Sequence, residues 1–295
     1  MISSTDKKDR LNIVLINPSY VLPFFSSAPP LWLLYLAAVA EQKNCKVHII
    51  DMVAKYSTYT ISNVVEQCER LRPDIIGVSL GLGQICSAYA LVDMLRPLKS
   101  LLVSGGPHTT QLPEEVIDHG FDISVLGEGE EIFSDIIDFV KGQKKLEDIN
   151  GIVYKKKDSF ISTGRREPIS DLDKPPFPAR HLISLSDYVR TDSDLDSFCT
   201  LITSRGCPFS CTYCVSSAVF GKKYIYRSPE NIIKEIIELH EKYDVKNIAF
   251  VDDLFTMDKE RIKRLCRLLI SSGISIHWSC ITKIDCLDKE LLNIM

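Results

Sequence analysis

Three cysteines stand close together in the second half of the sequence, at Cys207, Cys211 and Cys214, with the spacing CxxxCxxC. Thiolates at this spacing can ligate three irons of a [4Fe–4S] cluster and leave the fourth iron open to bind a substrate or cofactor. Tetrahedral zinc is usually held by two CxxC pairs, and the sequence has no matching second pair. The motif therefore predicts an iron–sulfur cluster. The alternative is a zinc site in which Cys199 is the fourth ligand.

The composition indicates a globular protein of a reducing compartment. The chain has 295 residues, a net charge of −4 and ten cysteines, and its first residues are polar rather than a secretory signal. Because thiols stay reduced in the cytosol, we expect a cytoplasmic location and interpret most cysteines outside the motif as small core residues. The charge balance predicts no nucleic-acid partner. The longest apolar run, 28–40, is shorter than the roughly 20 residues of a spanning helix, so no membrane span is expected.

The first half of the chain alternates short apolar runs with helical patterns. Near-continuous apolar runs are typical of parallel strands buried on both faces. Five such units predict a doubly wound, Rossmann-like α/β domain over residues 1–150. The expected strands are 12–17, 46–51, 74–80, 101–104 and 122–126, and the expected helices are 29–42, 61–71, 85–98, 113–118 and 131–140.

The loops after these strands are candidate ligand loops. Ligands of open α/β sheets bind at the carboxyl ends of the strands, and glycine lets the backbone approach a ligand closely. Glycines at these places could also serve only tight turns, and both interpretations stay open. No GxGxxG follows the first strand and no P-loop occurs, so nicotinamide and P-loop sites are not indicated. The loops are 18–28, 81–84, 105–110 and 127–130.

Helical periodicity stops between residues 151 and 196. Residues 151–154 and 159–162 flank a polar turn and predict a β-hairpin, and the prolines within 175–178 predict an extended linker. A third segment, 197–295, carries the cysteine motif. In it we expect strands at 200–203, 247–252 and 275–282, helices at 229–243 and 259–272, and a helix that starts at 288.

The motifs resemble a known family. CxxxCxxC with the aromatic Tyr213 looks like the radical S-adenosylmethionine (SAM) enzymes. The α/β domain is similar to the cobalamin (B12)-binding domain of their B12-dependent subgroup, and so are several further segments. These are SGGPHTT at 104–110, GEGE at 127–130, DLDKPPFPAR at 171–180, YRSPE at 226–230 and FVDD at 250–253.

The resemblance implies a radical mechanism at the cysteines. Cys207, Cys211 and Cys214 would ligate the cluster, and SAM would chelate the open iron and be cleaved reductively. Tyr213 would pack near the adenine, with ordinary packing as the alternative. Asp252 and Asp253 would hold the methionine end of SAM, with capping of the helix at 259–272 as the alternative. The implied reaction is methyl transfer or oxidative cyclisation at an unactivated carbon of a small-molecule substrate, with a flavodoxin or ferredoxin as electron donor.

The resemblance also implies a cobalamin site. The loop after the first strand starts Asn17-Pro18-Ser19-Tyr20 and has no histidine, so cobalamin is expected to bind without a protein histidine ligand. His108 could face the corrin tail, or it could be a histidine at a helix start with no metal role. The residues that would cradle the nucleotide tail are Ser79, Gly81, Gly105, Gly106, Gly127 and Gly129.

The third segment is shorter than a radical SAM barrel, which resembles a partial TIM barrel of six strands. Only three barrel strands are expected here, so the sequence is interpreted as truncated within the barrel, and the activity of the chain as it stands stays open. Two alternatives to an enzyme remain. One is a non-catalytic fragment that binds cobalamin or the cluster, and the other is a zinc-stabilised interaction protein.

Overall fold

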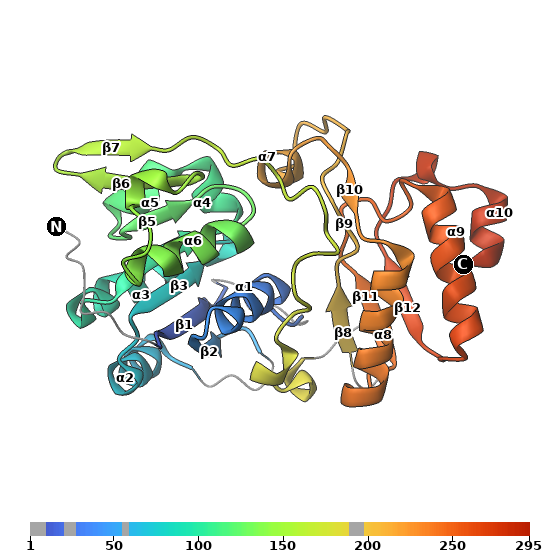
Figure 1. The fold of residues 1–295 in the computed structure, drawn as a ribbon, viewed down its shortest axis with the longest axis horizontal. Helices are drawn as coiled ribbons and strands as arrows, with labels where there is room; N and C mark the ends of the chain where they lie inside the picture. The colour runs from blue at the N-terminus through green and yellow to red at the C-terminus, as the bar shows by residue number, and fades with distance from the viewer. Residues whose placement is uncertain (1–9, 21–27, 55–58, 189–197) are drawn as a thin grey trace. The chain divides into compact units, whose positions relative to one another are not determined.

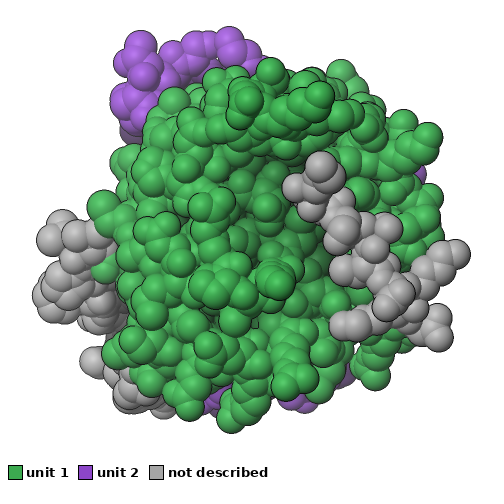
Figure 2. Space-filling view, turned by 90° about the vertical axis from the view of Figure 1, so that its left-hand side faces the viewer, with its two compact units in different colours: residues 1–24, 32–168, 178–183 green, residues 25–31, 169–177, 184–295 purple. Residues whose placement is uncertain are grey.

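The computed structural model describes residues 10–20, 28–54, 59–188 and 198–295. The chain divides into two compact units (Figures 1 and 2). Unit 1 comprises residues 1–24, 32–168 and 178–183, and unit 2 comprises residues 25–31, 169–177 and 184–295. In the part that the structure describes, no helix is long and apolar enough to cross a membrane.

Unit 1 contains one seven-stranded sheet with the order β2-β1-β3-β4-β5-β6-β7. The first five strands of this order are parallel, and β6 and β7 continue the sheet as an antiparallel hairpin. The order reverses between β1 and β3, as in flavodoxin-like doubly wound sheets. The strands are β1 (Asn12–Asn17), β2 (Lys46–Asp51), β3 (Ile75–Ser79), β4 (Leu101–Gly105), β5 (Ile123–Val125), β6 (Ile152–Lys156) and β7 (Ser159–Ser162).

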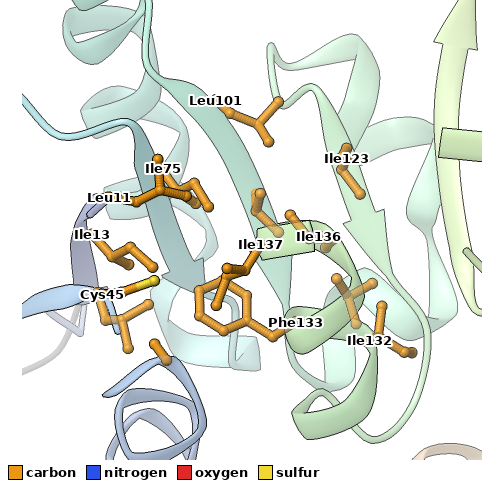
Figure 3. Packing of buried hydrophobic residues seen from close by; sticks show 14 of the residues in the cluster. Leu11, Ile13, Cys45, Ile75, Leu101, Ile123, Ile132, Phe133, Ile136 and Ile137 are labelled. Carbon is orange, nitrogen blue, oxygen red and sulfur yellow. The ribbon is translucent and has the colours of Figure 1, made fainter. Parts of the chain in front are cut away.

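Helices cover both faces of this sheet because alternate strand residues point to opposite sides. In β1, Ile13 and Leu15 belong to one buried cluster, and Val14 and Ile16 belong to another. Figure 3 shows the first cluster, in which Phe133 lies among strand residues. Its helices are α1 (Leu31–Gln42) and α6 (Glu130–Val140), and those of the second are α2 (Ile61–Leu71), α3 (Ile85–Leu95) and α5 (Pro113–Asp118). The predicted doubly wound fold is thus confirmed.

The structure differs from the sequence expectations in three details of unit 1. The helix expected at 85–98 ends as α3 at Leu95 and continues as a 3₁₀ turn, Arg96–Leu98, at Pro97. The hairpin was expected in the linker, but β6 pairs with β5 and extends the sheet of unit 1. A short helix that the periodicity did not indicate, α4 (Pro107–Gln111), follows β4.

Unit 2 contains three parallel strands in the order β12-β11-β8, with helices between them in the chain. Neighbouring strands follow each other in sequence, as in part of a β/α barrel, and α8 and α9 pack on them around Phe250 and Ile236. A two-stranded antiparallel pair, β9 with β10, lies next to the cysteine segment. The elements are β8 (Phe198–Leu201), β9 (Ser204–Arg205), α7 (Ser216–Phe220), β10 (Ile225–Tyr226), α8 (Pro229–Tyr243), β11 (Asn247–Phe250), α9 (Lys259–Ser272), β12 (His277–Cys280) and α10 (Lys289–Ile294).

Candidate functional site

The cysteine loop of unit 2 runs between β9 and α7. Cys207 is half-buried, Cys211 and Cys214 are exposed, and all three are free thiols. The backbone N–H of Cys214 donates to the carbonyl oxygen of Cys211 at 3.1 Å, so these two residues share one turn. The donor set suits an iron–sulfur cluster, because thiols that no disulfide engages are its usual ligands. No three His, Cys, Asp or Glu side chains among the described residues converge as metal ligands, so cluster binding would have to draw the sulfurs together.

Gly206 fixes the start of this loop. Its φ is +81°, in the region that favours glycine, and a Cβ here would lie 2.1 Å from the carbonyl oxygen of Lys223. The backbone N–H of Cys207 donates to the carbonyl oxygen of Gly221 at 3.3 Å. The strand that precedes the cysteines and the chain that follows α7 therefore lie in direct backbone contact.

We expect Gly206→Ala to destabilise unit 2 and to lower iron incorporation. The variant adds a backbone clash to the cost of a positive φ, which together amount to about 2 kcal/mol or more. Gly273→Ala is the matched control, because Gly273 also has a positive φ, of +70°, but no atom lies within 4 Å of the added Cβ. Urea unfolding and iron content per chain measure the difference. Equal losses in the two variants would contradict the role of the close approach.

A buried carboxylate organises the base of the loop. Asp252, after β11, accepts hydrogen bonds from the Thr203 backbone N–H at 3.1 Å, from Thr203 Oγ1 at 2.6 Å and from Ser204 Oγ. Arg261 of α9 donates to the carbonyl oxygen of Thr203 at 3.1 Å and to Tyr224 Oη at 3.2 Å. Burial raises the pKa of Asp252, which the hydrogen bonds and the Arg261 charge oppose. This network ties β11 and α9 to the segment that leads into the cysteines.

The candidate SAM residues differ in their surroundings. Asp252 is buried and its carboxylate is engaged by Thr203 and Ser204, so its effect on the loop is indirect. Asp253 is exposed and accepts a hydrogen bond from Ser216 Oγ, at the start of α7 and close to Cys214 in the chain. Tyr213 is 90% exposed, so it serves no packing role within unit 2. The capping of α9 falls to Asp258, whose side chain accepts from the Arg261 backbone N–H, and not to Asp252 or Asp253.

Sequence reasoning did not single out Lys283, which follows β12. Its ammonium lies 4.2 Å from the centre of the Phe209 ring, inside the cysteine loop. The hydrogen bond to Asp285 is the main cause that raises the pKa of Lys283, and the nearby Cys211 adds to it. A cation at the carboxyl end of a strand was visible in the sequence. The sequence did not show that this cation lies close to a loop some seventy residues earlier in the chain.

The candidate cobalamin residues lie at or just after the carboxyl ends of β3, β4 and β5 in unit 1. Ser79 ends β3 and Gly105 ends β4, so parallel pairing brings the turns after these strands to the same edge. At Gly106 the φ is +106°, and a Cβ would lie 2.9 Å from the carbonyl oxygen of Leu80. Gly127 donates its backbone N–H to Thr110 Oγ1 at 3.1 Å, which links the turn after β5 to α4. Gly81 and Gly129 lie in the turns after β3 and β5.

His108 is held inside unit 1 by two neighbours. Its Nε2 lies 3.2 Å from Tyr89 Oη and 3.3 Å from Glu115 Oε1, and its side chain is 9% exposed. Tyr89 also donates to Glu115 at 2.8 Å and stacks on His119. His108, near the start of α4, therefore joins α4 to α3 and α5.

The hydrogen bond from the Tyr89 hydroxyl to Glu115 contributes stability to unit 1 that is lost in acid. Its hydrogen bond is the main cause that lowers the pKa of Glu115 from the ordinary 4.5. The resulting stability is present above pH 4.5 and is lost as the pH falls through the lower pKa of the folded state. We expect Tyr89→Phe to remove this part of the loss of stability in acid. Melting temperatures between pH 7 and pH 3 measure the difference. Tyr59→Phe, which removes a hydroxyl that accepts from Gln67, should retain the loss; equal profiles for the two variants would contradict the assignment.

The comparisons with known proteins agree with this arrangement. Residues 20–137 match the family model of the B12 binding domain, and residues 201–292 match that of the radical SAM superfamily. An uncharacterized methyltransferase of Pyrococcus horikoshii is 31% identical over 274 residues, which are 92% of this chain and 58% of that protein.

Two solved structures share the fold. OxsB, a cobalamin-dependent SAM radical enzyme with aqua-cobalamin and SAM bound, matches with a TM-score of 0.78 and 23% identity over 91% of this chain and 38% of that one. TsrM, a radical SAM methyltransferase from Kitasatospora setae with cobalamin and a [4Fe–4S] cluster bound, matches with a TM-score of 0.75 and 17% identity over 96% of this chain and 56% of that one.

The fold and the two matched domains define the class: a B12-binding domain is followed by a radical SAM domain in one chain. The chain therefore contains a domain of the B12-binding family and a domain of the radical SAM superfamily. It spans less than two thirds of the length of the relatives reported above.

Proposed function

We propose that this chain is part of a radical SAM enzyme that uses cobalamin for methyl transfer to, or oxidative cyclisation at, an unactivated carbon of a small-molecule substrate. The observation that carries the proposal is the loop with Cys207, Cys211 and Cys214, which are free thiols after the first parallel strand of a radical SAM domain. The B12-binding match of unit 1 supports the cobalamin half, and the methyltransferase relative supports methyl transfer.

The residues of unit 2 would hold and orient the iron–sulfur cluster and SAM. When bound, the reduced cluster supplies the electron that cleaves SAM, and cobalamin supplies a carrier for the methyl group. The three thiols would hold the cluster, and the exposed Asp253 and Tyr213 are available to contact SAM beside it. Asp252 would act through Thr203 and Ser204, by keeping the start of the loop in place.

Unit 1 would hold cobalamin at the carboxyl edge of its sheet. Glycines at 105, 106, 127 and 129 keep the turns there free of side chains, so a nucleotide tail could approach the backbone closely. Ser79 is the last residue of β3 and Gly81 lies in the turn that follows. Binding without a protein histidine stays part of the proposal, because His108 is held by Tyr89 and Glu115.

The zinc alternative lacks support for its fourth ligand. Cys199 lies within β8, is buried in the core of unit 2 and donates to the carbonyl oxygen of Thr200 at 3.5 Å. A flavodoxin or ferredoxin as electron donor, and a cytoplasmic setting, remain proposals that follow from the reducing conditions such a cluster needs.

Anaerobic reconstitution with iron and sulfide tests the proposal. We expect about four irons per chain, and 5′-deoxyadenosine on addition of SAM and a strong reductant. Zinc in place of iron would contradict the cluster. A cluster without SAM cleavage would favour the non-catalytic binding fragment. Binding of hydroxocobalamin is measured separately, and its absence would remove the cobalamin half alone.

A further inference from the structure

A buried polar network joins the turns after the first three strands of unit 1. Gln84 Nε2 donates to Asn17 Oδ1 at 2.7 Å and to the carbonyl oxygen of Pro18 at 2.6 Å. Gln84 Oε1 accepts the backbone N–H of Gly81 at 3.1 Å. Asn17 Nδ2 in turn donates to Asp51 Oδ1 at 2.8 Å. One glutamine therefore links the turn after β3 to the end of β1 and, through Asn17, to the end of β2.

The network has one arrangement of donors and acceptors. Gln84, Asn17 and Asp51 are only 2%, 3% and 7% exposed, so water does not replace a lost partner easily. Both N–H groups and the oxygen of the Gln84 amide are engaged, and a flipped amide would set its oxygen against two acceptors. A buried network of this kind holds its members in one geometry.

The network lies where the strand order reverses. β1 lies between β2 and β3, and the crevice outside the carboxyl ends of β1 and β3 is where ligands of such sheets bind. Gly81, one of the candidate cobalamin residues, uses its N–H on Gln84 rather than on a ligand. Its part in the site therefore depends on where Gln84 holds the turn.

We infer that Gln84 is a positioning residue for cobalamin, because it holds the turns after β1 and β3 in the arrangement that the ligand meets. The inference rests on the proposed function of unit 1. It assigns a role to a side chain whose amide bonds to Asn17, Pro18 and Gly81.

Titration of the 295-residue chain with hydroxocobalamin, followed by corrin absorbance well below the melting temperature, tests this role. We expect Gln84→Leu, which keeps the volume and removes the donors and the acceptor, to weaken binding about tenfold or more. Where this variant does not fold, Gln84→Glu keeps the shape, lacks the Nε2 donors and should weaken binding similarly. At a temperature where a variant is fully folded, lower stability by itself does not change its affinity.

The control variant changes a residue at the amino ends of the parallel strands, opposite the proposed cobalamin site. Asp74 precedes β3, and its carboxylate accepts the backbone N–H of Asn12 at 2.8 Å. Asp74→Ala should lower the melting temperature and leave cobalamin affinity unchanged. Unchanged affinity in both Gln84 variants, or an equal loss in Asp74→Ala, would overturn the positioning role while the proposed function stands. If the unaltered chain does not bind cobalamin, the proposed function of unit 1 fails, and the inference fails with it.

Discussion

Replacement of Cys211 by alanine is expected to abolish assembly of the iron–sulfur cluster. The unaltered chain should retain about four irons after anaerobic reconstitution and the variant fewer than about one, because the remaining two thiolates do not hold the cube. Cys211 is exposed, so its truncation removes little packing and the melting temperature should change little. Iron and sulfide content per chain, with 5′-deoxyadenosine formation as a second readout, measure the effect.

A cysteine outside the loop provides the control for this prediction. Cys86 is also an exposed free thiol, but it lies in α3 of unit 1. Cys86→Ala should retain the full iron content and the same rate of SAM cleavage. An intact cluster in Cys211→Ala, or an equal loss in Cys86→Ala, would contradict the assignment of the loop.

Removal of the Asp252 carboxylate should have the largest effect on the stability of unit 2. Asp252→Ala leaves the donors of Thr203 and Ser204 without this acceptor and removes the negative charge that faces the buried Arg261 guanidinium. Loss of one partner from a buried charged network costs about 3–5 kcal/mol, because the other charge stays buried. We also expect lower iron incorporation, since Thr203 and Ser204 lead into the cysteine loop.

The two tryptophans allow the units to be followed separately. Trp32 lies in unit 1, and Trp278 lies in unit 2, where it packs against Phe250 and Phe255. In a Trp32→Phe background, urea unfolding followed by fluorescence therefore reports unit 2.

Asp253→Ala is the control for Asp252→Ala. It removes an exposed carboxylate and should cost less than about 1 kcal/mol of unfolding free energy. Similar losses of unfolding free energy in Asp252→Ala and Asp253→Ala would show that the buried network is not what stabilises unit 2.

Patterns that are local in the chain account for what could be predicted. The apolar runs and helical periods predicted five parallel strands with helices on both faces, and residues such as Ile13 and Val14 in β1 do point to opposite cores. The cysteine motif resembles that of the radical SAM enzymes, and the family match confirms a radical SAM domain. The hairpin was also predicted from its polar turn, but its place at the sheet edge depends on the pairing of β6 with β5, which local pattern does not specify.

The roles of single polar residues depended on contacts between distant parts of the chain. Asp252 was expected either to hold SAM or to cap a helix, and the structure engages it with Thr203, 49 residues earlier. Gln84 ends the candidate ligand loop 81–84, but the sequence did not indicate a role for its side chain, which bonds to Asn17, 67 residues away.

The sequence by itself determined the α/β periodicity, the cysteine spacing of a cluster site and the resemblance to B12-dependent radical SAM enzymes, because motifs and periods are properties of short segments. Only the tertiary structure decided which polar side chains are buried and what they hold. Those interactions form where strands and turns far apart in the chain come together, and a buried hydrogen bond contributes most where water is absent.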